Sequence, residues 1–290
     1  MTADVPTLTR LINTEVLLAM GLQPDGWLGR RVQPVLSRAT QRFAEIFSTA
    51  DHLIADEGMV CAAHWVLLRL VQGLRARGIE NIPPNGPLVI AANHPGAADS
   101  VAIGASAGRD DLKILASDVP FLKNLSQIGQ HLIFLPRKGI HARMLAMREG
   151  FRHLDSGGAL LIFPRGTIDP DPAFMPDAEA QLDRWSRSLA LFLAKVPTTR
   201  VVTSIVSHVV DPNYMHHPLT WLKRGRVDRQ RLAIMIQIIQ QMMGKKLDLE
   251  PRVSFGEAID WPAAKQAGDA LNAVVLAAKH LLHAHLAWQA

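Results

Sequence analysis

Hydrophobic residues recur with a helical period over the first quarter of the chain. Apolar positions three and four residues apart between Leu8 and Val16 predict an amphipathic helix that ends near Gly21. A second helix is predicted over residues 27–47 and a third over residues 51–77. The third is apolar around much of its circumference, which indicates packing on both sides or contact with lipid.

A turn-rich segment at residues 81–87, with three prolines and one glycine, marks a change of pattern. We therefore expect an N-terminal helical region over residues 1–78 and a second domain over residues 79–290. Short apolar runs typical of buried parallel strands follow, at residues 88–92, 113–116, 131–135, 159–163 and 201–206. An edge strand is predicted at residues 252–255.

Helical patterns lie between these runs, at residues 100–107, 140–154 and 177–194, and a closing amphipathic helix is predicted over residues 262–288. Alternation of strands and helices predicts an α/β fold. We expect a mostly parallel or mixed central sheet, flanked by helices and preceded by the N-terminal helical region.

The composition is that of a folded protein, because 48% of the 290 residues are hydrophobic and 20% are charged. The mean hydropathy of +0.10 is slightly high. However, the apolar stretch 59–74 is interrupted by His64 and Arg69, and the stretch 232–243 is too short to cross a bilayer. The N-terminus shows no secretion signal, and the single Cys61 excludes an internal disulfide and a thiolate metal cluster. A cytoplasmic location is therefore expected.

The formal net charge of +5 indicates an anionic partner, whether nucleic acid, anionic lipid or a phosphorylated small molecule. The charge alone does not choose among them. No recognised nucleic-acid module is present, and aromatic residues do not alternate with the basic clusters, so we expect no nucleic acid.

Candidate chemistry follows three of the predicted strands. Residues 93–99 carry an imidazole and a carboxylate, residues 136–139 carry a basic pair, and residues 164–167 carry an arginine with a glycine turn. Ligands of open α/β sheets bind beyond the carboxyl ends of the strands. These three segments are therefore predicted to meet at one site.

His94 and Asp99 are five residues apart, with Pro95 and Gly96 forming a turn before a helix that starts near Ala97. This spacing allows Asp99 to accept a hydrogen bond from one imidazole nitrogen, which leaves the other nitrogen as a general base for a hydroxyl. The alternative is a histidine in a simple turn with an aspartate at a helix N-terminus. The basic segments at the other strand ends favour the catalytic interpretation.

The run from Ile79 to Asp99, with Asn-His and an aspartate five residues after the histidine, resembles the first block of the glycerolphosphate acyltransferase superfamily, which includes lysophosphatidic acid acyltransferases. Residues 129–137 are similar to the second block, Phe-Pro-Arg-Gly-Thr at 163–167 to the third, and residues 203–206 stand where the fourth falls. The resemblance covers residues 79–257. It implies transfer of a fatty acyl group from a thioester of coenzyme A or acyl carrier protein to a hydroxyl of a phosphorylated glycerol or lysophospholipid-like acceptor, with no cofactor.

In this hypothesis His94 is the general base and Asp99 orients it. Arg137, assisted by Lys138 or Arg165, would bind the acidic head group. Backbone N–H groups of Gly166 and Thr167, at an expected helix start, would bind a phosphate or the oxyanion. The predicted substrate site therefore consists of Arg137, Lys138, Arg165, Gly166 and Thr167.

Two positions depart from the family pattern. Arg165 replaces the usual glutamate of the third block, and Ser204 or a neighbour replaces the proline of the fourth. An additional arginine favours a more anionic acceptor, or it pairs with a local carboxylate such as Asp169 without a catalytic role. A protein that binds lipid with the same fold but altered catalysis is therefore the main alternative function.

Two surfaces suit an anionic membrane, which would place the protein peripherally on the inner face. One is the N-terminal helical region. The other is the apolar helix 232–243 with Tyr214, Trp221 and a preceding basic cluster of Lys223, Arg224, Arg226, Arg229 and Arg231. A core helix with a solvated basic loop explains the second pattern equally well. A zinc hydrolase is disfavoured, because the C-terminal histidines 280, 283 and 285 have no carboxylate among them.

Overall fold

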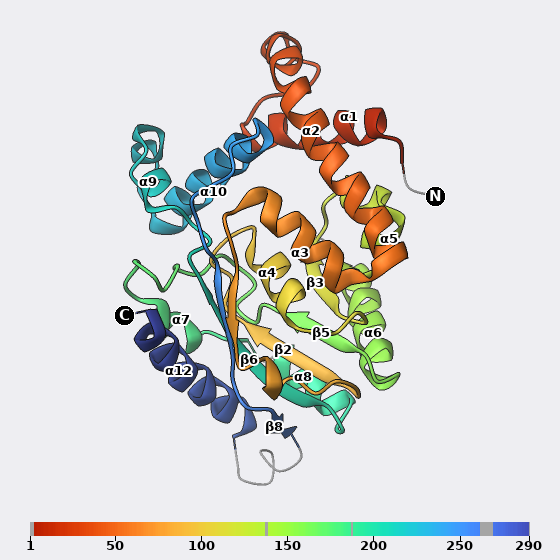
Figure 1. Ribbon diagram of the computed structural model, residues 1–290, viewed down its shortest axis with the longest axis vertical. Coiled ribbons are helices and arrows are strands. Elements are labelled where there is room, and N and C mark those ends of the chain that lie inside the picture. The colour runs from red at the N-terminus through yellow and green to blue at the C-terminus, as the bar shows by residue number, and fades with distance from the viewer. Residues whose placement is uncertain (1–2, 137–138, 187, 262–268, 290) are drawn as a thin grey trace.

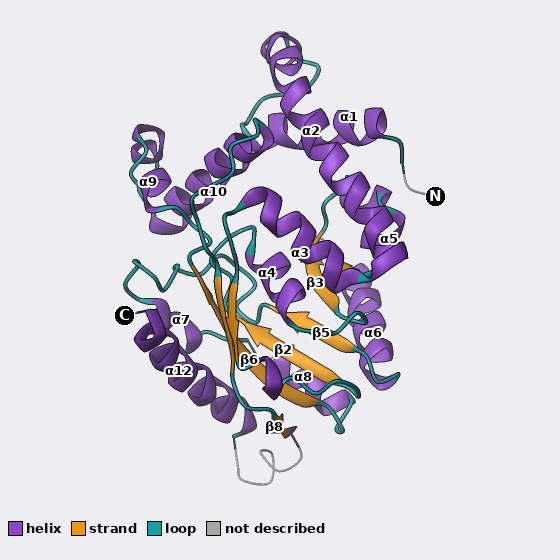
Figure 2. Ribbon diagram, viewed as in Figure 1, coloured by secondary structure: helices purple, strands orange, loops and turns teal. Residues whose placement is uncertain are grey.

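The computed structural model describes residues 3–136, 139–186, 188–261 and 269–289. Helices surround a central sheet on both faces (Figures 1 and 2). The α-helices are α1 (Val5–Ala19), α2 (Trp27–Glu57), α3 (Met59–Leu70), α4 (Asp99–Ser106), α5 (Ser126–Gln130), α6 (Ile140–Asp155), α7 (Ala178–Leu182), α8 (Ser188–Lys195), α9 (Pro212–Met215), α10 (Arg226–Met242) and α12 (Ala270–Gln289). Short 3-10 helices are η1 (Ile79–Asn81), η2 (Leu122–Asn124) and η3 (Pro218–Leu222).

The described residues form an eight-stranded mixed sheet of order β1-β7-β6-β2-β5-β3-β4, with β8 also paired to β6. Its strands are β1 (Arg75–Arg77), β2 (Leu88–Ala92), β3 (Lys113–Ser117), β4 (Leu132–Leu135), β5 (Ala159–Ile162), β6 (Arg200–Ser207), β7 (Arg252–Phe255) and β8 (Ile259–Asp260). Strands β6, β2, β5, β3 and β4 are mutually parallel, whereas β7 and β8 run antiparallel to β6. The predicted fold class, a mostly parallel or mixed sheet flanked by helices, is confirmed.

The central strands are buried on both faces because helices cover both. In β2, the side chains of Leu88 and Ile90 join one core, and those of Val89 and Ala91 join the other. The first core also contains residues of α1, α2, α3, α4 and α10, and the second contains residues of α6, α8 and α12. This double burial explains why β2 reads as a continuous apolar run in the sequence.

The N-terminal helices differ from their predicted bounds. A single helix, α2, continues through residues 48–57, and the helix predicted to reach residue 77 ends at Leu70, followed by strand β1. Gly58 separates α2 from α3 with φ +90°, and a Cβ there would lie 2.6 Å from an Asp110 carboxylate oxygen. Residues 75–77 are extended because they pair with β7. The helical pattern was therefore overridden at this end by tertiary pairing.

Two further expectations are corrected. The helix predicted over 177–194 is two helices, α7 and α8, and the intervening Trp185 is buried while Ser186 N–H donates to the Pro164 carbonyl at 3.2 Å. Strand β7 is not an edge strand, because β1 pairs with its outer side. Residues 262–268 of the predicted closing helix lie outside the described residues, and α12 begins at Ala270.

Helix α10 lies across the upper side of the sheet in Figure 1, beside α2 and α9. Ala233, Ile234 and Met242 of α10 are buried in the same core as α1 and α2. One face of the apolar stretch 232–243 therefore packs in the core, whereas Met243 is 65% exposed. Contact of this stretch with a membrane stays a prediction. Within the described ranges, no helix is long and apolar enough to span a membrane.

Candidate functional site

The predicted catalytic segments follow adjacent strands. Strand β2, which precedes residues 93–99, pairs in parallel with β5, which precedes residues 163–169. Asn93 fixes the start of the first segment, because its amide donates to the Val206 carbonyl at 2.9 Å and accepts from the Val206 N–H at 2.8 Å. The carboxyl ends of β2, β5 and β6 therefore meet at one edge of the sheet, which brings together two of the three predicted segments, 93–99 and 164–167.

His94 and Asp99 are in contact. Imidazole Nδ1 lies 2.8 Å from Asp99 Oδ2, and the same oxygen accepts the Gly96 N–H at 2.9 Å. Asp99 Oδ1 accepts the Ser100 N–H at 2.6 Å. Asp99 is the first residue of α4 and its side chain is 1% exposed, whereas the His94 side chain is 30% exposed. A buried carboxylate thus holds one ring nitrogen while part of the imidazole stays reachable from solvent.

The segment after β5 fixes His94 from a second side. The His94 N–H donates to Asp169 Oδ2 at 2.8 Å, and the Asp169 N–H donates to the His94 carbonyl at 2.8 Å. The ring of Phe163 stacks on the imidazole with a centroid distance of 4.4 Å and an angle of 27°. Phe163 of the third motif and Asp169, two residues after that motif, therefore set the ring plane and the backbone of His94.

The surroundings of His94 act on its pKa in opposite directions. Burial of the ring lowers the pKa, whereas the charge of Asp99, its hydrogen bond and the charge of Asp169 raise it, and the net effect is a raised pKa. This is the direction expected for an imidazole that takes up a proton and is then stabilised as the imidazolium.

Arg165 is committed to an internal ion pair. Its Nη1 donates to Asp169 Oδ1 at 3.0 Å and to the Ile168 carbonyl at 2.6 Å, and the side chains of Arg165 and Asp169 are 10% and 4% exposed. Burial raises the pKa of Asp169, and the His94 N–H and the Arg165 guanidinium oppose that shift. Of the two roles expected for Arg165, the geometry matches pairing with Asp169.

The predicted helix start at Gly166 and Thr167 is wrong. Residues 164–167 form a turn in which the Gly166 N–H donates to the Phe163 carbonyl at 3.0 Å, and the next helix, α7, starts at Ala178. Gly166 adopts φ +68°, which favours glycine. The turn is closed by its own backbone and carries no helix dipole.

Arg137 and Lys138 lie outside the described residues, so their predicted contact with the acceptor stays a prediction. The strand before them, β4, is the edge of the sheet, with β3 and β5 between it and β2. At about 4.8 Å per strand, β4 stands roughly 14 Å from β2. The ends of the three strands that precede the predicted segments are therefore not equally close to the end of β2.

Gln230 of α10 is a residue that sequence reasoning missed. Its side-chain amide is fully buried and donates to the Pro95 carbonyl at 2.8 Å and to the Asp169 carbonyl at 2.6 Å. Arg226 Nη1 in turn donates to Gln230 Oε1 at 2.6 Å. One side chain thus joins the loop of His94 to the loop of Asp169. The sequence of α10 gives no local sign of this role, because Gln230 is one of four glutamines in the helix.

Asp171 was also missed. Its fully buried carboxylate accepts the N–H groups of His208, Val209 and Val210, at 3.0, 2.9 and 3.1 Å, and that of Ala173 at 3.0 Å. It therefore joins the loop after β5 to the loop after β6. The Asp-Pro-Asp sequence at 169–171, in the loop that follows β5, was the signal available.

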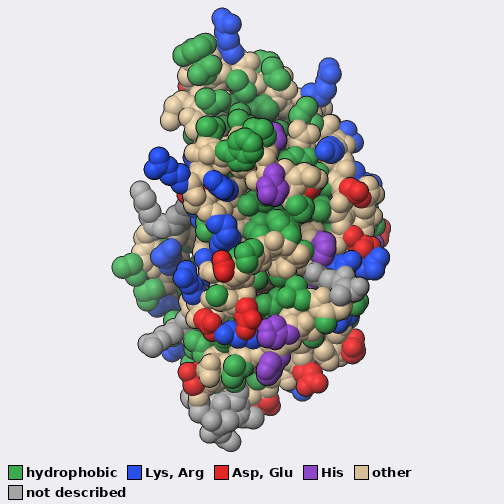
Figure 3. Space-filling model, turned by 90° about the vertical axis from the view of Figure 1, so that its left-hand side faces the viewer, with side chains coloured by type: hydrophobic (Ala, Val, Ile, Leu, Met, Phe, Trp, Pro, Cys, Tyr) green, Lys and Arg blue, Asp and Glu red, His purple; other side chains and the backbone are tan. Residues whose placement is uncertain are grey.

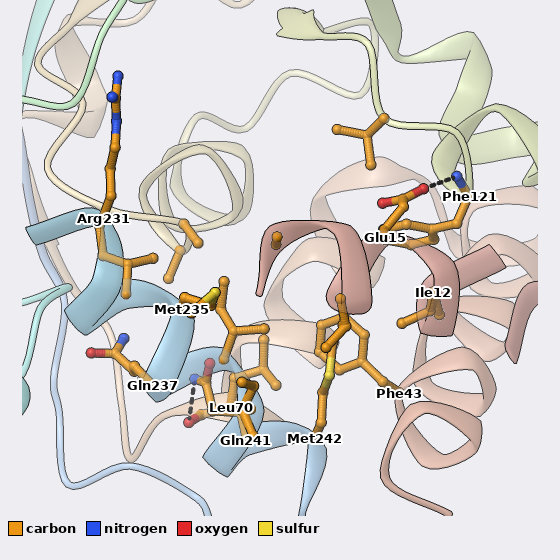
Figure 4. A pocket seen from close by; sticks show the side chains of 18 of the residues that line it. Ile12, Glu15, Phe43, Leu70, Phe121, Arg231, Met235, Gln237, Gln241 and Met242 are labelled. Atoms are coloured by element: carbon orange, nitrogen blue, oxygen red, sulfur yellow. Dashed lines mark hydrogen bonds between the residues drawn. The ribbon is translucent and has the colours of Figure 1, made fainter. Parts of the chain in front are cut away.

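A mostly apolar cavity of about 760 Å³ lies beside the site (Figure 4). Its wall includes Ala97 and Ala98, from the loop between His94 and Asp99, although His94 itself does not line it. Figure 4 shows Phe43, Met235 and Met242 among its lining side chains, with Arg231 at one side and Glu15 at the other. Helices α1, α2, α4 and α10 supply most of the wall. The volume is within the range of about 300–1,000 Å³ that is usual for ligand pockets.

The histidines considered for zinc do not assemble a site. Among the described residues, no group of three or more histidine, cysteine, aspartate or glutamate side chains is placed to hold a metal ion. His285 is bonded to serine hydroxyls, and His283 lies 3.0 Å from Glu179 on the surface.

Residues 73–202 match the Acyltransferase family. This segment contains His94, Asp99 and Arg165, so the resemblance that the motifs indicate is confirmed for it. The chain is also similar to the crystal structure of the 1-acyl-sn-glycerophosphate (LPA) acyltransferase, PlsC, from Thermotoga maritima, with 16% identity and a TM-score of 0.47 over 99% of this chain and 95% of that chain. No curated protein matches the chain.

Proposed function

We propose, from the acyltransferase family that residues 73–202 match, that this chain transfers a fatty acyl group from a thioester to a hydroxyl of a glycerophosphate-like acceptor. The observation that carries the proposal is the contact between His94 Nδ1 and Asp99 Oδ2 at 2.8 Å, with the imidazole still 30% exposed. A structural histidine needs no such access.

In the proposed reaction His94 acts through Nε2. With Nδ1 held by Asp99, Nε2 accepts the proton of the acceptor hydroxyl while that oxygen attacks the thioester carbonyl. The C–S bond of the tetrahedral intermediate then breaks, and the departing thiolate takes the proton from the imidazolium. Between these two proton transfers, the carboxylate of Asp99 stabilises the imidazolium. The donor, coenzyme A or acyl carrier protein, is part of the proposal.

The apolar cavity is the proposed site of an acyl chain. Its lining by α1, α2, α4 and α10 is apolar over most of its length, and its wall at Ala97 and Ala98 belongs to the His94 loop. A chain in the cavity would have its reactive end beside that loop. Each buried methylene contributes about 0.8 kcal/mol, so the cavity supplies binding energy that increases with chain length.

The membrane surface proposed for this protein is the turn η3 and the basic residues after it. Trp221 and Leu222 are 68% and 76% exposed, and exposed Lys223 and Arg224 follow. Figure 3 shows Lys and Arg side chains gathered near hydrophobic ones on the side of the molecule that carries α9 and α10. Tyr214, expected at this surface, is buried instead. Co-sedimentation with anionic vesicles at low salt, lost in a Trp221→Ser/Leu222→Ser variant, tests this attachment, and equal sedimentation of both proteins contradicts it.

The proposed activity is tested with an acyl thioester and a panel of acceptors, namely lysophospholipids, glycerol phosphate and amine-headed compounds, with mass spectrometry of the products. We expect His94→Ala to lower kcat/KM by about 10²–10⁴, the usual contribution of general base catalysis. His141→Ala, the same change at an exposed histidine of α6, is the matched control. Circular dichroism must show both variants folded. Undiminished turnover in His94→Ala would refute the mechanism, and binding of lipid without transfer by the wild type would favour the lipid-binding alternative.

A further inference from the structure

An acidic acceptor requires a cation near His94, and the arginine of the third motif does not supply one. Arg165 directs its guanidinium to Asp169 and the Ile168 carbonyl, and its side chain is only 10% exposed. Moving it to a ligand would leave the buried Asp169 carboxylate without its ion-pair partner, which is costly. Among the described residues, a cation for the head group must therefore come from an element outside the third motif.

Arg231 of α10 has the required position. It lines the same cavity as Ala97 and Ala98 of the His94–Asp99 motif and as Ser100, the next residue along α4. Its Nη2 donates to the hydroxyl of Thr167, in the third motif, at 3.3 Å. The guanidinium therefore reaches the loop after β5, and Arg231 shares a cavity wall with residues next to His94, although α10 lies beyond the segment that matches the Acyltransferase family.

Arg231 is held at this place but its guanidinium is free to exchange partners. The preceding residue, Gln230, anchors this part of α10 through its bonds to the Pro95 and Asp169 carbonyls. The ion pair of Arg231 with Asp228 is long, at 3.5 Å, and both side chains are more than half exposed, at 56% and 60%. Such exposed pairs are weak, so a phosphate would displace Asp228 at little cost.

We propose that Arg231, together with the Thr167 hydroxyl, binds the phosphate of the acceptor and so determines its specificity. The inference rests on the proposed acyltransferase function and adds to it the residue that recognises the head group. The planar guanidinium presents several N–H donors, which suit a phosphate with two or more oxygens in reach. Arg165 is then a positioning residue that holds Asp169 and, through it, the backbone of His94.

The kinetic test compares 1-acylglycerol 3-phosphate with the phosphate-free 1-acylglycerol as acceptors, at saturating acyl-coenzyme A. For Arg231→Gln we expect KM for the phosphorylated acceptor to rise about tenfold to hundredfold, as for loss of a hydrogen bond to a charged group. KM for 1-acylglycerol and for acyl-coenzyme A should not change, and Arg231→Lys should recover part of the loss. Arg148→Gln removes the same charge from an exposed position of α6 that does not line the cavity in the described structure, and it should behave as wild type.

The outcomes separate this inference from the proposed function. An unchanged KM for the phosphorylated acceptor overturns the role of Arg231, and a rise confined to acyl-coenzyme A reassigns it to the phosphates of the donor and also overturns it. Isothermal titration calorimetry with glycerol 3-phosphate, without any donor, gives a second measurement. We expect binding to wild type and an affinity about tenfold to hundredfold lower for Arg231→Gln. Equal affinities refute the inference even if transfer occurs, whereas wild type that binds glycerol phosphate but transfers no acyl group refutes the proposed function alone.

Discussion

His94 and His285 are both held by side-chain oxygens, in two different regions of the molecule. At the end of β2, His94 Nδ1 lies 2.8 Å from a carboxylate oxygen of Asp99. Between α12 and the sheet, His285 Nδ1 lies 2.7 Å from Ser254 Oγ and Nε2 lies 2.8 Å from Ser207 Oγ. Both nitrogens of His285 are thus engaged by hydroxyls, and the ring is fully buried.

The electrostatic surroundings of the two rings are opposite. The carboxylates of Asp99 and Asp169 outweigh burial and raise the pKa of His94. Burial, with the positive charges of Arg77 and Arg252, lowers the pKa of His285 to about 3. A base needs an accessible nitrogen and a charge that stabilises its protonated form. The comparison shows that His94 meets both conditions and that His285 meets neither, which makes His285 a structural link between α12 and strands β6 and β7.

The largest expected effect comes from removing the side chain that binds Nδ1 of each histidine, Asp99 for His94 and Ser254 for His285. The first change should lower activity, and the second should lower stability. Asp99→Asn should lower kcat/KM by about 10²–10⁴, because the amide no longer stabilises the imidazolium or selects its tautomer. Ser254→Ala leaves His285 Nδ1 without a hydroxyl, which should cost about 1–3 kcal/mol of unfolding free energy. Its kcat/KM should stay close to the wild-type value. Steady-state kinetics and urea denaturation of both variants measure the two effects, and a loss of turnover in folded Ser254→Ala comparable to that of Asp99→Asn would remove the contrast.

The second prediction concerns the loss of folding stability in acid, which the lowered pKa of His285 should cause. Its pKa in the folded protein, about 3, is below the ordinary value of 6.5 in the unfolded chain, so the unfolded state binds the proton first. Stability is therefore lost as pH falls below about 6.5, by about 1.4 kcal/mol per pH unit, or roughly 2 kcal/mol by pH 5. His285→Gln keeps a polar amide without a titrating ring, and its unfolding free energy should fall less between pH 7 and pH 5. Urea denaturation at both pH values measures this, and equal slopes for variant and wild type would show that His285 does not control acid stability.

The strands could be predicted from the sequence because of their double burial. The predicted runs at 88–92 and 113–116 differ from β2 and β3 by at most one residue. A strand covered on both faces must be apolar throughout, so its signal is local. Where pairing with a distant strand decides the conformation, as at β1, the local pattern predicted a helix instead.

The centre of the site was predictable for the same reason. His94 and Asp99 belong to one short loop at a strand end, so their contact follows from five residues of sequence. The surrounding contacts join distant parts of the chain. Asp169 reaches His94 across 75 residues, and Gln230 reaches Pro95 across 135. No periodicity or motif spacing specifies such contacts.

Clustering of one residue type proved a poor guide to chemistry. His280, His283 and His285 lie close in sequence, yet His285 is bonded to serines inside the protein and His283 contacts Glu179 on the surface. An α-helix has 3.6 residues per turn, so positions two apart, such as His283 and His285, point to opposite sides of the helix. His94 is alone in its segment, and its environment rather than its neighbours in sequence distinguishes it.

The smallest effect expected concerns the second carboxylate near His94. The neutral imidazole is the proposed base, so its raised pKa places the acid limb of the kcat/KM profile above the ordinary histidine value of about 6.5, with activity increasing as pH rises through it. Asp169→Asn removes one of the charges that raise this pKa, and the acid limb should move to lower pH while Asp99 maintains part of the shift. Asp25→Asn, at an exposed position between α1 and α2, is the control for the loss of one negative charge. If the limb stays in place or moves to higher pH in folded Asp169→Asn, Asp169 acts on His94 only through the backbone contact, and Asp99 alone sets the charge of the base.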